Sequence, residues 1–298
     1  MSRILAAACL AALALLGGCS SDGGSDQPTP TPARETGSPI AAATTYDTYV
    51  ALGDSYTAAP LVPPTDTSTI CLRSGVNYPA QLTKAMPGTT LTDVSCSGAR
   101  TADMTGRQTG QFGSVPPQFD ALKPTTDLVT IGLGGNDDGL FVSTLGGCTQ
   151  LASSDPTGSP CADAAARENV LDPALADIRA NLAGVVRGVR ERSPDARIIV
   201  VGYPQIAPES GSCDALPLAA GDYAFVRKVN QGLSDAVRLG ATDAGAEFLD
   251  LWGPSAGHDI CSSEPWINGR LTTGAAAAYH PFAVEQQAVA DLLLTQVQ

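Results

Sequence analysis

The stretch Tyr49-Val50-Ala51-Leu52-Gly53-Asp54-Ser55-Tyr56 runs from apolar, strand-forming residues into a small polar turn. An apolar run that ends at a glycine predicts a buried strand followed by a tight turn. That turn would present the Ser55 hydroxyl at the point where the chain leaves the sheet. Because Gly-Asp-Ser also occurs in ordinary turns, the meaning of Ser55 depends on the rest of the chain.

Alternating strand and helix patterns predict the fold. Strands are expected at 49–52, 90–95, 128–133, 197–202 and 247–251. Continuous apolar runs such as Ile198-Ile199-Val200-Val201 are typical of strands covered on both faces, as in a parallel sheet. The clearest helix pattern spans 173–193, with Asp172 as its expected cap and Pro173 in its first turn.

Further helices are expected at 221–241 and from 281 to the C-terminus. The alternation predicts an α/β fold, a three-layer α/β/α sandwich with a central parallel five-stranded sheet and right-handed crossovers. Two segments, 58–74 and 146–169, break this rhythm and are expected to be loops at the functional rim of the domain.

The N-terminal residues indicate export. Residues 1–18 have a positive start and a short apolar run, as in a signal peptide. The run ends at Cys19 in a pattern that resembles the lipobox of bacterial lipoproteins, in which such a cysteine is lipidated. The alternative is a plain secretory signal with Cys19 incidental. Residues 19–45 are rich in Ser, Gly, Thr and Pro and are expected to form a flexible tether to a domain at 46–298.

Composition argues against several classes of function. The formal net charge is −13 and no basic cluster occurs, which argues against nucleic-acid binding. The chain has only 2 histidines and no Cys-x-x-Cys pair, so we expect no metal site. The segment 132–137 lacks the last glycine of a dinucleotide-binding loop, and no Gly-x-Ser-x-Gly elbow is present. We therefore expect no cofactor.

Six cysteines remain once Cys9 and Cys19 are assigned to the leader and the lipid site. Many pairings are possible. Our hypothesis is that neighbours pair, because each pair then closes a segment that resembles a loop: Cys71–Cys96, Cys148–Cys161 and Cys213–Cys261. Each bridge would contribute about 2–4 kcal/mol to stability.

Residues suited to acyl transfer follow the first three predicted strands. In an open α/β sheet, ligands bind beyond the carboxyl ends of the strands. Ser55 follows the first strand, Gly98 the second and Asn136 the third, while His280 precedes the last helix. A serine hydroxyl needs a base such as an imidazole to become a nucleophile. The N–H groups of Ser55 and Gly98 and the Asn136 amide could stabilise an oxyanion.

These blocks resemble the GDSL-type esterases of the SGNH hydrolase family, over 46–298. Residues 53–58 match the first block with Tyr56 in place of Leu, and the segment 134–137 matches the third. The resemblance implies a flavodoxin-like fold, Ser55 as nucleophile, His280 as base, and Gly98 and Asn136 as oxyanion donors. The six cysteines resemble a secreted bacterial branch with three disulfides.

One position departs from the family pattern. An Asp usually precedes the histidine by three residues, and here that position is Ala277. We expect the backbone carbonyl of Ala277 to orient His280, as in some secreted members of the family. The alternative is a carboxylate from elsewhere, Asp250 or Asp259. A carbonyl would offer less charge to the imidazolium than a carboxylate.

Each of these residues also has a purely structural interpretation. Ser55 and His280 could cap helices, and Gly98 and Asn136 could be ordinary turn residues. His258 is the rival base, but we expect it to be a structural histidine in a disulfide-pinned loop. Asp54 and Asp137 are expected to hold their turns through side-chain to backbone bonds.

The function that we predict is that of an exported serine carboxylester hydrolase. Its substrate would be an acyl lipid or an acylated small molecule, and the protein would be a monomer, anchored to the outer face of the membrane only by a lipid or else secreted. One alternative is a polysaccharide O-deacetylase, although an aromatic content of 5% argues against sugar platforms. Another is a catalytically weak envelope-binding homologue, which the absence of the usual Asp favours.

Overall fold

The computed structural model describes residues 45–298. The predicted signal peptide (1–18), the lipidation site Cys19 and the tether up to residue 44 lie outside the described residues. Within the described part, no helix has the length and apolar character needed to cross a membrane.

The core of the fold is a parallel sheet with strand order β2-β1-β5-β6-β7. Its strands are β1 (Thr48–Gly53), β2 (Thr90–Asp93), β5 (Leu128–Gly132), β6 (Arg197–Val201) and β7 (Glu247–Leu249). All five lie where the sequence predicted them. Counted along the chain, the strands of this sheet lie in the order 2-1-3-4-5, which is the flavodoxin-like order. The first and third strands, β1 and β5, are therefore adjacent and form the topological switch point.

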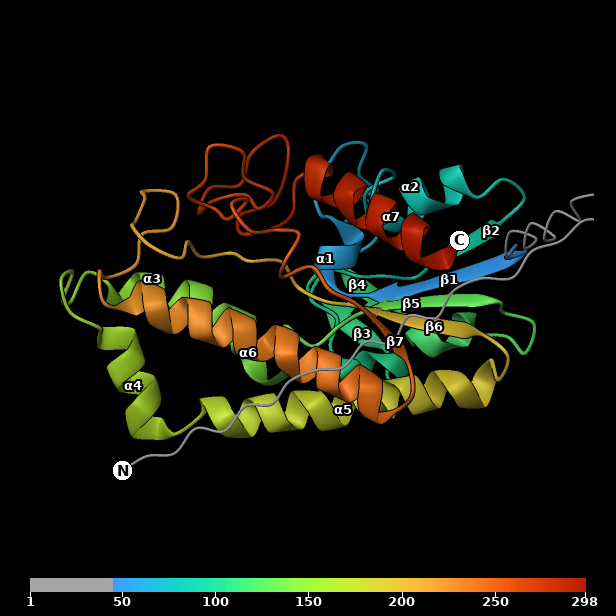
Figure 1. Ribbon diagram of the computed structural model, residues 1–298, viewed down its shortest axis with the longest axis horizontal. Helices are drawn as coiled ribbons and strands as arrows, with labels where there is room; N and C mark the ends of the chain where they lie inside the picture. Colours follow the sequence, from blue (N-terminus) through green and yellow to red (C-terminus); the bar gives the residue numbers. More distant parts are fainter. Residues whose placement is uncertain (1–44) are drawn as a thin grey trace, which may run out of the picture. The chain divides into compact units, whose positions relative to one another are not determined.

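Helices cover both faces of this sheet (Figure 1). Two long helices, α5 (Leu171–Arg192) and α6 (Asp222–Asp243), pack on one face, while α2 (Tyr78–Ala85) and α7 (Ala283–Val297) pack on the other. The smaller elements are the helices α1 (Ser55–Ala58), α3 (Cys148–Leu151) and α4 (Pro160–Glu168), and a hairpin of β3 (Gln108–Gly110) and β4 (Gly113–Val115).

Alternate side chains of strand β1 pack against the helices on opposite faces of the sheet. Val50 and Leu52 belong to the apolar cluster shared with α5 and α6, while Tyr49 and Ala51 belong to the cluster shared with α2 and α7. Successive side chains of a strand point to opposite faces. A continuous apolar run is therefore the pattern expected of a strand that is covered twice.

Helix α5 begins earlier than the sequence predicted. It starts at Leu171, and Val170 occupies its N-cap position without a side-chain capping bond. Asp172 therefore lies in the first turn and does not cap the helix. A negative charge in that position still interacts favourably with the helix dipole.

The segment 146–169 was predicted to be a loop, and this was wrong. It holds the end of a π-helical turn (Val142–Gly147), followed by α3 and α4. The carboxylate of Asp222 accepts bonds from the N–H groups of Cys161 and Ala162, at 3.1 and 2.9 Å, and so caps α4 from about 60 residues away. A cap supplied from α6 leaves no local sequence signal. The other predicted loop, 58–74, is irregular beyond α1.

The three predicted disulfides are present: Cys71–Cys96, Cys148–Cys161 and Cys213–Cys261. The hypothesis of neighbour pairing is confirmed.

Candidate active site

Ser55 is the first residue of α1, directly beyond the end of β1, and only 6% of its surface is exposed. Asp54 caps this short helix, because its Oδ1 accepts a bond from the N–H of Tyr56 at 2.8 Å. The N–H of Asp54 donates to the carbonyl of Gly132 at the end of β5, also at 2.8 Å. The expectation that Asp54 holds its turn is confirmed.

The glycines that end β1 and β5 leave room for Thr57. A Cβ on Gly53 would lie 2.2 Å from Thr57 Oγ1, and one on Gly132 would lie 2.4 Å from the same atom. Helix α1 can therefore fold back over both strand ends only because neither carries a side chain. This packing sets the position of Ser55 relative to the sheet.

A buried tyrosine, Tyr203, links the turn at Asp54 and Ser55 to the turn after β5. The Tyr203 hydroxyl donates to Asp54 Oδ2 at 2.5 Å and accepts from the N–H of Gly135 at 2.9 Å. Asp54 and Tyr203 are 1% and 4% exposed. Burial raises the pKa of Asp54 to about 7, against the opposing effect of the bond from Tyr203.

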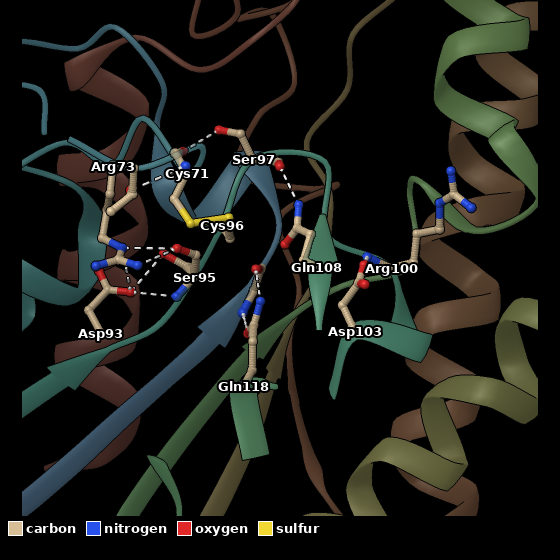
Figure 2. The surroundings of a disulfide bond; sticks show 12 residues. Cys71, Arg73, Asp93, Ser95, Cys96, Ser97, Arg100, Asp103, Gln108 and Gln118 are labelled. Atoms are coloured by element: carbon tan, nitrogen blue, oxygen red, sulfur yellow. Dashed lines mark hydrogen bonds and ion pairs between the residues drawn. A yellow bond between two sulfur atoms is a disulfide. The ribbon is translucent and has the colours of Figure 1, made fainter. Parts of the chain in front are cut away.

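The turn that contains Gly98 is held by a disulfide and by side chains around it (Figure 2). The N–H of Cys96 donates to Gly53 O at 3.0 Å, which ties this turn to the one before Ser55. Gln108 Nε2 donates to the carbonyl of Ser97 at 2.7 Å. Gly98 itself has a φ of 77°, a left-handed conformation that glycine adopts without strain.

The turn that contains Asn136 is tied to the Gly98 turn. Asn136 Nδ2 donates to Ala99 O at 3.0 Å, which uses one of the two amide hydrogens. The carboxylate of Asp137 accepts from the N–H and hydroxyl of Thr101, at 2.9 and 2.6 Å. Asp137 was expected to hold its own turn, and it holds the neighbouring one.

The backbone N–H groups of Ser55 and Gly98 are available to a ligand. Within residues 45–298, no group accepts a hydrogen bond from the N–H of Ser55 or of Gly98. The turns that carry them are joined to each other through Gly53 O, and the second amide hydrogen of Asn136 lies at the same edge of the sheet. The predicted oxyanion donors therefore lie on three connected turns at the carboxyl ends of β1, β2 and β5.

His280 is oriented by a backbone carbonyl, but not by the one that the sequence predicted. Its Nδ1 lies 2.6 Å from the carbonyl oxygen of Ala278. The carbonyl of Ala277 instead accepts from Asn268 Nδ2 at 3.0 Å and from the backbone N–H of His280 at 3.3 Å. Tyr279, between them, has a φ of 61°, and this turn brings the Ala278 carbonyl to the ring.

Neither of the alternative carboxylates binds His280. Asp250 accepts from the N–H groups of Trp252 and Gly253, and Asp259 accepts from that of Cys261. Both carboxylates are therefore engaged in their own loops.

The His280 ring lies against the residue that follows Ser55. Its centroid is 5.8 Å from that of Tyr56 and 5.5 Å from that of Phe141. The Tyr56 hydroxyl donates to Tyr279 O at 3.0 Å, which ties the two segments together. Burial lowers the pKa of His280 below its ordinary value of 6.5. The imidazole is therefore neutral at neutral pH, the form in which it can accept a proton.

His258 has a structural role, as expected. Its Nδ1 donates to the carbonyl of Glu264 at 2.8 Å, and its ring stacks on Trp266 with centroids 4.8 Å apart. The backbone carbonyl of His258 accepts from the N–H of Trp266 at 2.8 Å. These contacts hold the loop that the Cys213–Cys261 disulfide closes.

Two residues of the site were not identified from the sequence. Tyr203 follows the end of β6, and that position was its only signal. Gln286 donates to Tyr56 O at 2.9 Å and accepts from the N–H of Tyr78 at 2.7 Å, so α7 holds both α1 and the start of α2. A glutamine in a helix carries no sign of such a role.

A small apolar cavity of about 30 Å³ lies beside Tyr56, the residue after Ser55. Its lining includes Tyr56, Phe141 and Tyr203, together with Ile206, Val229 and Leu233. Its lining is almost wholly apolar.

The chain matches the model of the GDSL-like Lipase/Acylhydrolase family over residues 51–283. It is 41% identical to Lipase 2 of Streptomyces coelicolor over 85% of this chain and 86% of that protein. Two crystal structures are similar, each covering 85% of this chain and 99% of the other. The extracellular lipase of Streptomyces rimosus has a TM-score of 0.70 and 31% identity, and phospholipase A1 of Streptomyces albidoflavus has 0.68 and 29%.

Proposed function

Because the chain belongs to the GDSL-like lipase/acylhydrolase family, we propose that Ser55 and His280 carry out ester hydrolysis through an acyl-enzyme. Family membership and the similarity to Streptomyces lipases make the chain a serine carboxylic ester hydrolase. The roles of individual residues are our proposal, and the geometry of the turns supports it.

In the first step, Ser55 Oγ attacks the ester carbonyl carbon while the unbound ring nitrogen of His280, Nε2, takes the hydroxyl proton. The carbonyl oxygen becomes an oxyanion that accepts bonds from the N–H groups of Ser55 and Gly98 and from the Asn136 amide. When the ester bond breaks, His280 protonates the departing alkoxide. Water, deprotonated by His280, then attacks the acyl-enzyme and releases the carboxylic acid and free Ser55.

The single observation that carries this proposal is the setting of His280. Its Nδ1 is held by the Ala278 carbonyl and its ring lies against Tyr56, the neighbour of Ser55. A donor bond from Nδ1 fixes the tautomer in which Nε2 accepts a proton. A carbonyl carries only a partial charge, so it stabilises the imidazolium less than a carboxylate would.

The similarity to Streptomyces lipases favours an acyl ester over an acetylated sugar. This supports a lipase or esterase over the polysaccharide O-deacetylase.

The protein is exported, because its three disulfides form and persist in an oxidising compartment. We propose that residues 1–18 are removed, that Cys19 carries a lipid on the outer face of the membrane, and that 19–45 tether a monomeric domain at 46–298. Metabolic labelling with an alkyne-tagged fatty acid tests the anchor: the label should enter the wild type and be lost in Cys19→Ser. Equal labelling of both would contradict it.

The catalytic assignment is tested with Ser55→Ala. We expect it to abolish both hydrolysis of p-nitrophenyl butyrate and labelling by a fluorophosphonate probe. Ser153→Ala, at an exposed position away from the site, is the matched control and should behave as wild type. Retention of both activities in Ser55→Ala would overturn the assignment. A wild type that takes up the probe but hydrolyses no ester would instead favour the catalytically weak homologue.

A further inference from the structure

Gln118 is a buried glutamine whose side chain pairs with the backbone at the end of β1. Only 2% of its surface is exposed, and it begins a short 3₁₀ helix, Gln118–Ala121. The N–H of Gly53 donates to Gln118 Oε1, and Gln118 Nε2 donates to Gly53 O, each at 2.9 Å (Figure 2). The side-chain amide, with one donor and one acceptor in use, therefore takes the place of a neighbouring peptide group.

The end of β1 needs such a partner because β2 is the shorter strand. The register in which β1 pairs with β2 ends at Ala51 and Asp93, before the chain reaches Gly53. A buried backbone N–H that lacks an acceptor destabilises the folded state. Gln118 Oε1 supplies the acceptor for the N–H of Gly53 beyond the point where β2 ends.

Gly53 joins the two turns that carry the backbone oxyanion donors. Its carbonyl accepts from the N–H of Cys96 at 3.0 Å as well as from Gln118. Ser55 follows Gly53 by two residues, and Gly98 follows Cys96 by two residues. The N–H groups of Ser55 and Gly98 are therefore each two residues from one end of the same hydrogen bond. Gln118 holds the Gly53 end of that bond in place.

Helix α5 fixes the position of Gln118 through the next residue, Phe119. The Phe119 ring is 6% exposed, and the Arg192 guanidinium carbon lies 4.6 Å from its centroid. A Cβ on Gly188 would lie 2.6 Å from Phe119 Cε2, so this glycine leaves the space that the ring fills. The amide of Gln118 is therefore presented to β1 by a packed element of the fold.

We propose that Gln118 is a positioning residue for ester hydrolysis: by holding Gly53, it sets the separation of the two N–H groups that must converge on the oxyanion. The inference rests on the proposed function, since the N–H groups of Ser55 and Gly98 are oxyanion donors only if Ser55 attacks an ester carbonyl. Such donors act by their placement, and a displacement of about 1 Å can lower a rate by about 100-fold. Loss of the Gln118 amide should lower kcat and leave KM nearly unchanged, because the oxyanion forms only after the ground state.

The test compares p-nitrophenyl butyrate with p-nitrophenyl thionobutyrate, in which sulfur replaces the carbonyl oxygen. Sulfur is a weak hydrogen-bond acceptor, so an enzyme that uses oxyanion donors should have the larger kcat/KM for the oxygen ester. The ratio of the two kcat/KM values reports on the donors and does not change with the fraction of folded enzyme. Gln118→Met is close to glutamine in size and loses both bonds. It should lower this ratio by about tenfold or more, through kcat for the oxygen ester.

Gln118→Glu is a second measurement, which decides the question if Gln118→Met fails to fold. A protonated carboxyl can accept from the N–H of Gly53 and donate to Gly53 O, as the amide does, whereas an ionised carboxylate has no proton to donate. The pKa of a buried Glu reaches at most about 9, so the series runs from about pH 5.5 to about pH 10. The ratio in Gln118→Glu should equal that of the wild type at low pH and fall as the carboxyl ionises. The wild-type ratio should stay constant.

Ser193→Ala is the control for a loss of stability alone. Ser193 is fully buried and donates to Lys123 O at 2.8 Å, just before β6 begins and so at the edge of the sheet opposite to Ser55. This variant should lower Tm and keep the wild-type ratio. A wild-type ratio in folded Gln118→Met, or in Gln118→Glu throughout the pH series, would overturn the inference and leave the proposed function intact. A wild type with no preference for the oxygen ester would overturn both.

Discussion

Replacing Tyr203 by Phe should destabilise the protein, and more so at high pH. The hydroxyl of Tyr203 serves two buried groups, the carboxyl of Asp54 and the N–H of Gly135. A buried polar group that loses its partner costs about 1–3 kcal/mol, so we expect a loss of about 3 kcal/mol in the free energy of unfolding. For a domain of this size, that is a decrease of about 6–12 °C in Tm.

The pH dependence follows from the carboxyl group. The pKa of Asp54 is about 7, so Asp54 is protonated in the folded protein at about pH 5.5 and ionised at about pH 8.5. An ionised buried carboxylate that loses a donor is penalised more than a neutral carboxyl. Urea unfolding at both pH values should therefore show a larger loss for Tyr203→Phe at the higher one.

Tyr223→Phe is the matched control. Tyr223 is also buried, and its hydroxyl is hydrogen-bonded to backbone groups of Cys213 and Leu216. Tyr223→Phe should lower the free energy of unfolding by a similar amount at both pH values. An equal cost of Tyr203→Phe at the two pH values, or a cost below about 0.5 kcal/mol, would refute the reasoning.

Three further predictions concern titration and cross-linking. Burial raises the pKa of Glu285 from 4.5 to about 8, so the folded state retains a proton that the unfolded chain loses, and stability falls as pH rises through this range. In urea unfolding, Glu285→Gln should reduce the fall of the free energy of unfolding with pH. An unchanged pH dependence in this variant would contradict the prediction. Because burial lowers the pKa of His280, kcat/KM should rise with pH along an acid limb with a midpoint below 6.5, and a midpoint above that value would count against the assigned base. The Cys213–Cys261 bridge spans 48 residues and Cys148–Cys161 spans 13, so loop entropy predicts losses of about 4 and 3 kcal/mol in the paired Cys→Ser variants. The reverse order of Tm values would show that native contacts outweigh loop length.

Much of the fold and of the site follows from local patterns. The apolar run before Gly53 predicts a doubly covered strand, because both of its faces must be buried. Small residues after the strand ends predict tight turns, and parallel strands bring those turns to one edge. Ser55, Gly98 and Asn136 could be placed together for this reason.

What could not be predicted depends on partners that are distant in sequence or on a single backbone angle. The choice of Ala278 over Ala277 at the His280 ring is decided by the left-handed conformation of Tyr279, which no pattern of side chains indicates. Helix α4 is capped by Asp222 from another helix. The bond from Tyr203 to Asp54 joins residues 149 positions apart. Such contacts exist only once the layers have packed.

The most direct test of the central claim is to locate a fluorophosphonate label by peptide mapping and to measure its rate in histidine variants. The chain has 2 histidines, so each serves as a control for the other. We predict that the label is on Ser55, that His280→Ala slows labelling by orders of magnitude, and that His258→Ala labels at the wild-type rate. A label on another serine, or equal rates in the wild type and His280→Ala, would contradict the assignment of Ser55 and His280 as nucleophile and base.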